Sequence, residues 1–370
     1  MRYKSQKNDR LLVFYTIKGV SLLVKALLGR ILYTRATNFL NGFVMTISTD
    51  ILRKVAQVTG SESIAETQLI QSLWGGYGEL FRATLNNCQH SSVIVKHIKL
   101  PQPKLHPRGW NTAISHQRKL ASYQVEVNWY QNFANGCTKQ SPVPKCLFVE
   151  QLDNEILLVL EDLKTLGFSE VYKEVGQVQV KACLSWLAYF HAHYLDVEPD
   201  GLWESGTYWH LETRPDELSA LSDKVLKDAA EEIDRTLKHS HFQTLVHGDA
   251  KLANFCFTPK GDRVAGVDFQ YVGKGCGMKD VILFISSSVS FSECEARVPG
   301  LLDHYFSELR QAVAELQPDV DPELVEQAWR PLYCVAWADF QRFVKGWCPD
   351  HWKINAYTEG LTQRALAQLR

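Results

Sequence analysis

The pattern of hydrophobic and polar positions divides the chain into a strand-rich part and a helical part. Val93–Ile98 alternates with a period of two and Ile156–Leu160 is a short apolar run, both typical of strands. Helical spacing begins over Tyr123–Phe133 and returns in the second half over residues 177–195, 219–238, 296–316, 321–347 and 355–369. We therefore predict an α+β fold with two lobes, a small strand-rich lobe at 45–161 and a larger, mostly helical lobe at 162–370.

Residues 1–44 do not fit either lobe. They contain eight basic residues and one acidic residue, a net charge of +7, whereas the remaining 326 residues carry −8. The apolar stretch at 11–33 is interrupted by Lys18, Lys25 and Arg30, so it falls short of the roughly 20 apolar residues that span a membrane. Two interpretations stay open, a basic amphipathic helix on a membrane surface or a segment upstream of a native start at Met45. Membrane contact is expected only through residues 1–44.

The composition is that of a soluble globular protein, with 45% hydrophobic and 22% charged residues. The 40 basic and 41 acidic residues give a net charge of −1, which argues against a dedicated nucleic-acid binder. The nine cysteines are scattered and include no Cys-x-x-Cys pair. They therefore favour a reducing, cytoplasmic location over a disulfide framework or a zinc site.

A glycine-rich segment precedes the alternating strand. Gly75, Gly76 and Gly78 lie between two apolar runs, as in a flexible strand-turn-strand cover over the phosphates of a nucleotide. A plain hairpin explains these glycines about as well, because they do not match the G-x-G-x-x-G pattern.

Lys96 and Glu126 are charged residues at apolar positions. Alternation places Lys96 on the face of Ile94 and Ile98, and helical spacing places Glu126 on the face of Tyr123 and Tyr130. Buried ions are costly unless they are paired, so we predict an ion pair that holds the ammonium against nucleotide phosphates. Taken singly, each residue could instead be a surface side chain that buries only its stem.

The buried strand at 156–160 is followed at once by Glu161, Asp162 and Leu163. A strand that leaves one lobe for the other exposes backbone donors and acceptors that can pair with adenine. We therefore expect Glu161 and Leu163 to contact the base.

The most informative segment is His247-Gly-Asp-Ala-Lys-Leu-Ala-Asn254, which is followed by a predicted hairpin and then by Asp268. A carboxylate such as Asp249 can orient a hydroxyl, and Asn254 and Asp268 supply oxygen ligands for Mg²⁺. Lys251 can neutralise charge on a transferred phosphoryl group. Each aspartate alone could be a turn residue or a cap, but the ordered set predicts phosphoryl transfer.

This order of segments resembles the small-molecule branch of the protein-kinase-like fold, which holds the aminoglycoside phosphotransferases, the choline kinases and the ecdysteroid-kinase-like group. The resemblance covers residues 73–284 and implies a bilobal fold with ATP and Mg²⁺ as cofactors. It implies that Lys96 binds phosphate with Glu126 as its helix partner. It also implies that Asp249 is the catalytic base, with Asn254 and Asp268 as the magnesium ligands.

Two further positions follow from the same resemblance. His247-Gly-Asp249 resembles the H-G-D of this branch, where protein kinases have H-R-D. Asp280 resembles the acidic residue that follows the metal ligand and braces the catalytic loop. Because Asp280 follows Asp268 by only 12 positions and no A-P-E sequence follows, there is no room for a protein-kinase activation loop. We therefore expect a small hydroxylated acceptor.

Two other functions stay open. A catalytically silent nucleotide-binding pseudokinase would share the fold, and a metal-dependent phosphohydrolase could use Asp249, Asp268 and Asp280 but would leave Lys96 and Glu126 unexplained. An aromatic stripe at Trp329, Tyr333, Trp337 and Phe340 is expected to be core, with a cage for a cationic acceptor as the alternative.

Overall fold

A five-stranded antiparallel sheet forms within residues 63–161 of this computed structural model, which describes residues 47–73, 76–100 and 113–370. The segment 1–44, the proposed start at Met45 and the predicted phosphate-contacting Gly75 lie outside the described residues. The strand order is β1-β2-β3-β5-β4. The strands are β1 (Ser63–Ser72), β2 (Gly78–Asn86), β3 (Ser92–Lys99), β4 (Cys146–Leu152) and β5 (Glu155–Glu161).

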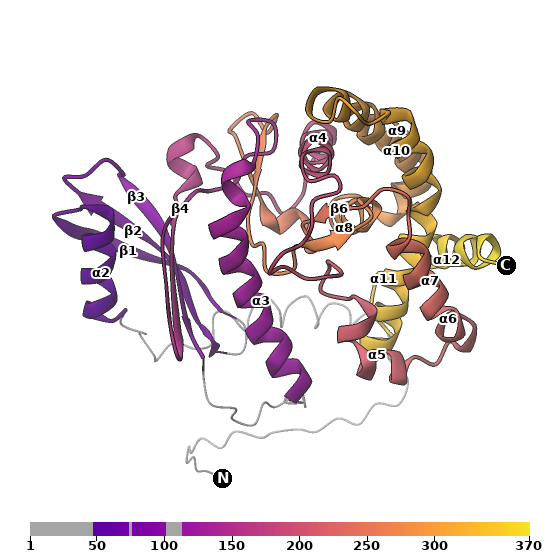
Figure 1. The fold of residues 1–370 in the computed structure, drawn as a ribbon, viewed down its shortest axis with the longest axis horizontal. Helices are drawn as coiled ribbons and strands as arrows, with labels where there is room; N and C mark the ends of the chain where they lie inside the picture. The colour runs from indigo at the N-terminus through magenta and orange to yellow at the C-terminus, as the bar shows by residue number, and fades with distance from the viewer. Residues whose placement is uncertain (1–46, 74–75, 101–112) are drawn as a thin grey trace, which may run out of the picture. The chain divides into compact units, whose positions relative to one another are not determined.

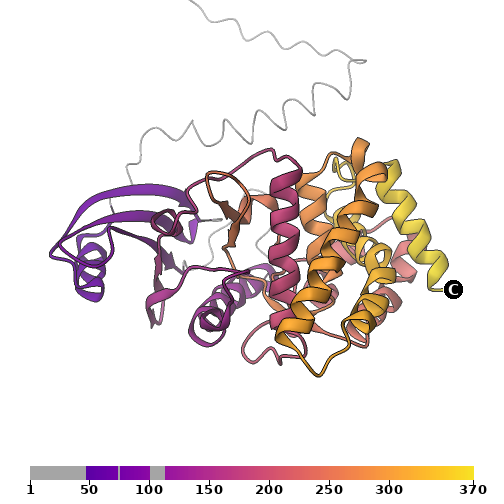
Figure 2. The ribbon, with the colours of Figure 1, turned by 90° about the horizontal axis from the view of Figure 1, so that it is seen from above.

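Helix α3 (Ala113–Asn132) lies between this sheet and the helical part (Figure 1, Figure 2). The helical part consists of α4 (Gln177–His193), α5 (Pro215–Ala220), α6 (Lys224–Asp228), α7 (Ala230–Lys238), α8 (Met278–Ser288), α9 (Phe291–Leu316), α10 (Pro322–Trp329), α11 (Tyr333–Trp347) and α12 (Ala356–Gln368). The chain also forms α2 (Thr49–Thr59) and the 3-10 turns η2 (Ala134–Gly136), η3 (Leu163–Leu166), η4 (Leu211–Thr213), η5 (Leu252–Asn254) and η6 (Arg330–Leu332).

The segment that follows α7 contains two short antiparallel strand pairs. Strand β6 (Thr244–Val246) pairs with β9 (Gly273–Gly275), and β7 (Phe255–Phe257) pairs with β8 (Val264–Gly266) as the predicted hairpin. The α+β prediction is confirmed by this division into sheet and helices. Residues 53–370 form one compact unit, so the boundary between lobes at residue 161 stays a prediction.

Four of the predicted helices differ from the structure. The helix predicted at 123–133 is the second half of the longer α3, which begins at Ala113. The helix predicted at 219–238 is divided, because α5 ends at Ala220 and the side chain of Asp223 accepts a hydrogen bond from the Leu226 N–H to start α6, which α7 follows. The helix predicted at 321–347 is interrupted by η6, where Pro331 lacks the N–H of a regular turn. The helix predicted at 296–316 begins earlier, at Phe291.

The main apolar core lies in the helical part. Trp329, Tyr333, Trp337 and Phe340 are at most 5% exposed and belong to this core, as the core interpretation predicted. Among the described helices, none is both long and apolar enough to cross a bilayer. All nine cysteines are free thiols.

Candidate active site

A cavity of about 490 Å³ lies between the sheet, α3 and the segment 247–254, and most of the predicted site residues line it. Its lining includes Lys96, Glu126, Glu161, Leu163, Asp249, Lys251, Asn254 and Asp268. These residues come from β3, α3, the end of β5, η3 and the segment between β6 and β9. Polar side chains up to 172 positions apart in the sequence, those of Lys96 and Asp268, therefore line the same cavity.

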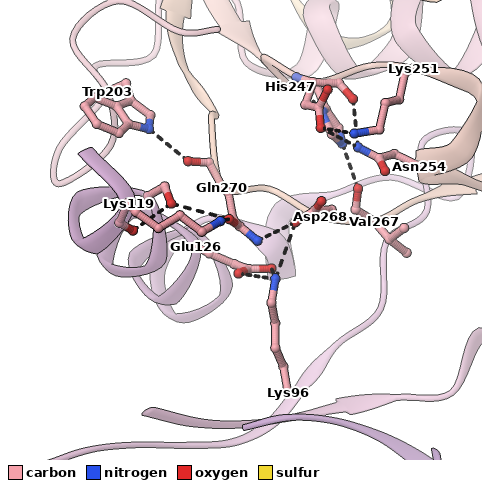
Figure 3. Close-up of polar contacts among 12 residues, drawn as sticks. Lys96, Lys119, Glu126, Trp203, His247, Lys251, Asn254, Val267, Asp268 and Gln270 are labelled. Carbon is pink, nitrogen blue, oxygen red and sulfur yellow. Dashed lines mark hydrogen bonds and ion pairs between the residues drawn. The ribbon is translucent and has the colours of Figure 1, made fainter. Parts of the chain in front are cut away.

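The ion pair predicted between Lys96 and Glu126 is present. Lys96 Nζ lies 2.6 Å and 2.8 Å from the two carboxylate oxygens of Glu126, and 3.4 Å from Asp268 Oδ1 (Figure 3). Burial alone would lower the pKa of Lys96, but the charges of Glu126 and Asp268 outweigh it and raise the pKa. Lys96 is therefore a cation that lines the cavity.

Packing between α3 and the residue after Asp268 sets this geometry. The ring of Trp129, one turn after Glu126, stacks on Phe269 with 4.4 Å between centroids. Asp268 itself has φ of 69°, in the left-handed region that aspartate tolerates better than most residues. Its carboxylate thereby faces Lys96 (Figure 3).

The two oxygens of Asp249 have different surroundings. Oδ2 accepts hydrogen bonds from Lys251 Nζ at 2.7 Å and Asn254 Nδ2 at 3.1 Å. Oδ1 is buried and accepts no hydrogen bond from any described residue. Burial raises the pKa of Asp249, against the opposing charge of Lys251. An unpaired carboxylate oxygen with a raised pKa is suited to receive a proton.

Asn254 and Asp268 are chemically suited to Mg²⁺. Because the amide nitrogen of Asn254 donates to Asp249, the amide oxygen is the atom left for a cation. Burial would raise the pKa of Asp268, but Lys96, Lys251 and Lys119 outweigh it and hold the pKa at about 2. One carboxylate and one amide oxygen match what Mg²⁺ usually takes from protein when phosphates supply the other ligands.

Asp280 and His247 are not among the described residues that line the cavity, but they hold the segment 247–254 in place. Asp280 Oδ2 and Oδ1 accept the backbone N–H groups of His247 at 2.5 Å and Gly248 at 2.9 Å. His247 Nε2 donates to the carbonyl of Val267 at 3.0 Å, and its Nδ1 accepts the N–H of Asp249. The bond from His247 to Val267 connects the segment 247–254 to the residue that precedes Asp268.

The nucleotide contacts predicted for Glu161, Gly76 and Gly78 stay predictions. The N–H of Glu161 already donates to the carbonyl of Lys145 at 2.9 Å, so this donor is not available to adenine. Gly76 and Gly78 do not appear among the described residues that line the cavity. Gly78 instead allows close sheet packing, because a Cβ there would overlap the backbone carbonyl of His97 on β3.

Sequence reasoning missed Lys119 and Gln270, which line the same cavity. Lys119 could have been predicted from the sequence, because it precedes Glu126 by seven residues and therefore lies on the same face of the helix. Gln270 stands two residues after Asp268 and carried no recognisable motif. Its role depends on side-chain contacts across 148 to 151 residues.

The sequence of this chain matches the model of a known protein family. The model of the ecdysteroid kinase-like family matches residues 78–198 and 204–318, more than half of the chain. The chain belongs to the ecdysteroid kinase-like family. The matched segments of this ecdysteroid kinase-like chain include Lys96 and Glu126 as well as Asp249 and Asp268, and therefore cover both sides of the cavity.

Individual relatives are distant. An uncharacterized kinase-like protein of Caenorhabditis elegans is 24% identical over 207 residues, which are 49% of this chain and 55% of that protein. The chain thus spans about half the length of the curated relative that it matches. Among solved structures, it is similar to an ethanolamine kinase of Plasmodium vivax, with 12% identity, a TM-score of 0.45 and 96% of each chain covered.

The chain is also similar to a choline kinase of Cryptosporidium parvum, with 11% identity and a TM-score of 0.45. That match covers 87% of this chain and 95% of the choline kinase. Because both TM-scores are below 0.5, the family assignment rests on the family model.

Proposed function

We propose that the protein is an ATP-dependent phosphotransferase that moves the γ-phosphoryl group of MgATP to a hydroxyl of a small molecule. The observation that carries the proposal is the unpaired, buried Oδ1 of Asp249. It belongs to the same cavity as the Lys96–Glu126 ion pair and Asp268. Membership of a kinase-like family supports the same conclusion.

The proposed reaction assigns one task to each group. The acceptor oxygen forms a bond to the γ-phosphorus, the bond from that phosphorus to the β–γ bridging oxygen breaks, and ADP leaves. Asp249 Oδ1 receives the proton of the acceptor hydroxyl. Lys96, held by Glu126, and Lys251, held by Asp249, provide positive charge to the phosphates on two sides of the cavity.

Mg²⁺ would be held by the amide oxygen of Asn254 and the carboxylate of Asp268, and when bound it would neutralise phosphate charge. Asp280 would act through the backbone of His247 and Gly248, whose N–H groups it accepts. Leu163, at the start of η3, would contact the adenine. These roles make catalysis a matter of positioning and charge compensation.

The acceptor is proposed to be a small hydroxylated molecule. Support comes from the 12-residue interval between Asp268 and Asp280, in which β9 and the start of α8 leave no long loop to bind a polypeptide substrate. A cytoplasmic location is part of the proposal, and nine free thiols suit a reducing compartment.

Magnesium-dependent ADP release from ATP by the full chain tests the proposal, with and without a pooled library of hydroxylated metabolites. We expect the pool to stimulate ADP release from the wild-type protein and not from Asp249→Asn, which keeps the shape of the side chain but cannot accept the proton. Fractionation of the pool would then identify the acceptor.

Two results would contradict the proposal. Tight ATP binding without stimulated turnover by any acceptor would favour a silent nucleotide-binding protein. Hydrolysis of simple phosphoesters in the absence of nucleotide would favour a metal-dependent phosphohydrolase.

A further inference from the structure

Lys119 is a cation of the cavity to which the proposed function gives no task. It projects from α3 two turns before Glu126, and its ammonium lies over the ring of Tyr123, 4.4 Å from the centroid. Figure 3 shows it reaching toward the same space as Lys96, from a different side. Lys96, Lys119 and Asp268 all line the cavity.

The partners of Lys119 are neutral. Its Nζ donates to the amide oxygen of Gln270 at 2.8 Å, and no carboxylate of the described residues lies within 4 Å of it. Lys96 and Lys251, by contrast, each form an ion pair at 2.6–2.7 Å. Burial, followed by the like charge of Lys96, lowers the pKa of Lys119 to about 8. Two ammonium groups that repel each other in one partly buried cavity are stabilised when an anion binds between them.

Gln270 holds Lys119 in this position. Its amide oxygen accepts hydrogen bonds from Lys119 and from Ser122 Oγ at 3.3 Å, and its amide nitrogen donates to Asp268 Oδ1 at 2.7 Å. Its backbone carbonyl accepts the indole N–H of Trp203 at 2.9 Å. With donors on one side and a carboxylate on the other, the orientation of the amide is determined. The Gln270 amide therefore links Lys119 directly to the carboxylate proposed to hold the metal.

We propose that Lys119, held by Gln270, is a further phosphate-binding residue, beside Lys96 and Lys251, for the terminal phosphates of a nucleoside triphosphate. The inference rests on the proposed function and extends it. A polyphosphate is the ligand class that fits, because Lys96, Lys119 and Lys251 line one cavity together with the proposed metal ligands. The terminal phosphates are assigned because Lys119 is linked to Asp268, beside the proposed site of transfer.

Calorimetric binding of adenosine, ADP and a non-hydrolysable ATP analogue to the full chain tests this inference. We expect Lys119→Met to weaken binding of the ATP analogue by about tenfold, the order of one charged hydrogen bond, and to leave adenosine binding unchanged. Lys119→Arg should restore most of the loss because it keeps the charge. The matched control is Lys139→Met, which removes an equal charge from an exposed position and should change neither affinity.

Each other outcome has a distinct meaning. If Lys119→Met keeps the wild-type ratio of triphosphate to adenosine affinity, the inference is wrong and the proposed function stands. A loss that is equal for adenosine and for the ATP analogue would make Lys119 a structural residue and also overturn the inference. If the wild-type protein binds the triphosphate no better than adenosine, the proposed function itself fails, and this inference with it.

Discussion

At the scale of single residues, removing one member of the buried Lys96–Glu126 ion pair should lower the free energy of unfolding. Glu126→Leu leaves the ammonium of Lys96 buried, with Asp268 at 3.4 Å as its remaining ion-pair partner among the described residues. We expect it to lower the free energy of unfolding by about 3–5 kcal/mol, measured by urea denaturation. The double variant Lys96→Met/Glu126→Leu removes both charges and should be more stable than Glu126→Leu, though inactive.

An exposed ion pair provides the control. Lys54 and Glu150 are 2.7 Å apart, but their side chains are 35% and 34% exposed. Glu150→Leu should therefore change the free energy of unfolding by less than about 1 kcal/mol. If Glu126→Leu were as mild as Glu150→Leu, Lys96 would have to be solvated in the folded protein.

Asp249 should lower the stability of the fold at neutral pH. Because its pKa is raised in the folded state, its favourable contribution exists below the ordinary pKa of 3.8 and is lost as the pH rises through the folded-state value. Asp249→Asn should therefore have a higher urea midpoint than the wild-type protein at pH 7, and the difference should shrink toward pH 4. A difference that grows as the pH falls would contradict the raised pKa.

At the scale of elements, the turn at His247-Gly248-Asp249 depends on glycine. Gly248 has φ of 77°, and a Cβ there would overlap the backbone carbonyl of Tyr271 and lie 2.8 Å from the amide nitrogen of Thr207. Gly248→Ala must displace the segment that carries Asp249. We expect a loss of at least about 2 kcal/mol in the free energy of unfolding and of at least about tenfold in phosphotransfer rate.

The control for this change is a glycine in open space. A Cβ at Gly360, in α12, would have no other atom within 4 Å, and the backbone there is not left-handed. Gly360→Ala should raise the free energy of unfolding by about 0.5–1 kcal/mol and leave turnover unchanged. Equal effects of the two substitutions would remove the steric argument for Gly248.

At the scale of the whole molecule, a ligand in the cavity contacts elements from both the sheet and the helical part and should stabilise them together. A non-hydrolysable ATP analogue with Mg²⁺, at 100 times its dissociation constant, should raise the Tm by on the order of 5 °C. In Asp268→Asn the nucleotide should still raise the Tm, but addition of Mg²⁺ should add nothing. A full magnesium effect in that variant would remove Asp268 from the metal site.

Much of this architecture was predictable because local patterns specify it. Alternation identified β3, an apolar run identified β5, and spacing identified α4 and α12 to within two residues. Asp249 and Asn254 are only five positions apart, so their combined chemistry is visible in the chain itself. The sequence did not indicate the helix interruptions at Asp223 and Pro331. The helical spacing of apolar residues continues past both positions, and the N-cap at Asp223 and the proline at 331 are each a single, local sign of a break.

The α+β division and the ordered set of reactive residues could be predicted from local patterns. The buried pairing of Lys96 with Glu126 was predictable too, because buried charge on two apolar faces has few other solutions. Three further features depend on tertiary contacts: Glu161 lacks a free N–H, Gly78 serves sheet packing, and Gln270 links Lys119 to Asp268. These contacts join residues distant in the chain. Their geometry follows from how α3 packs against the strands and the catalytic segment, which no local period encodes.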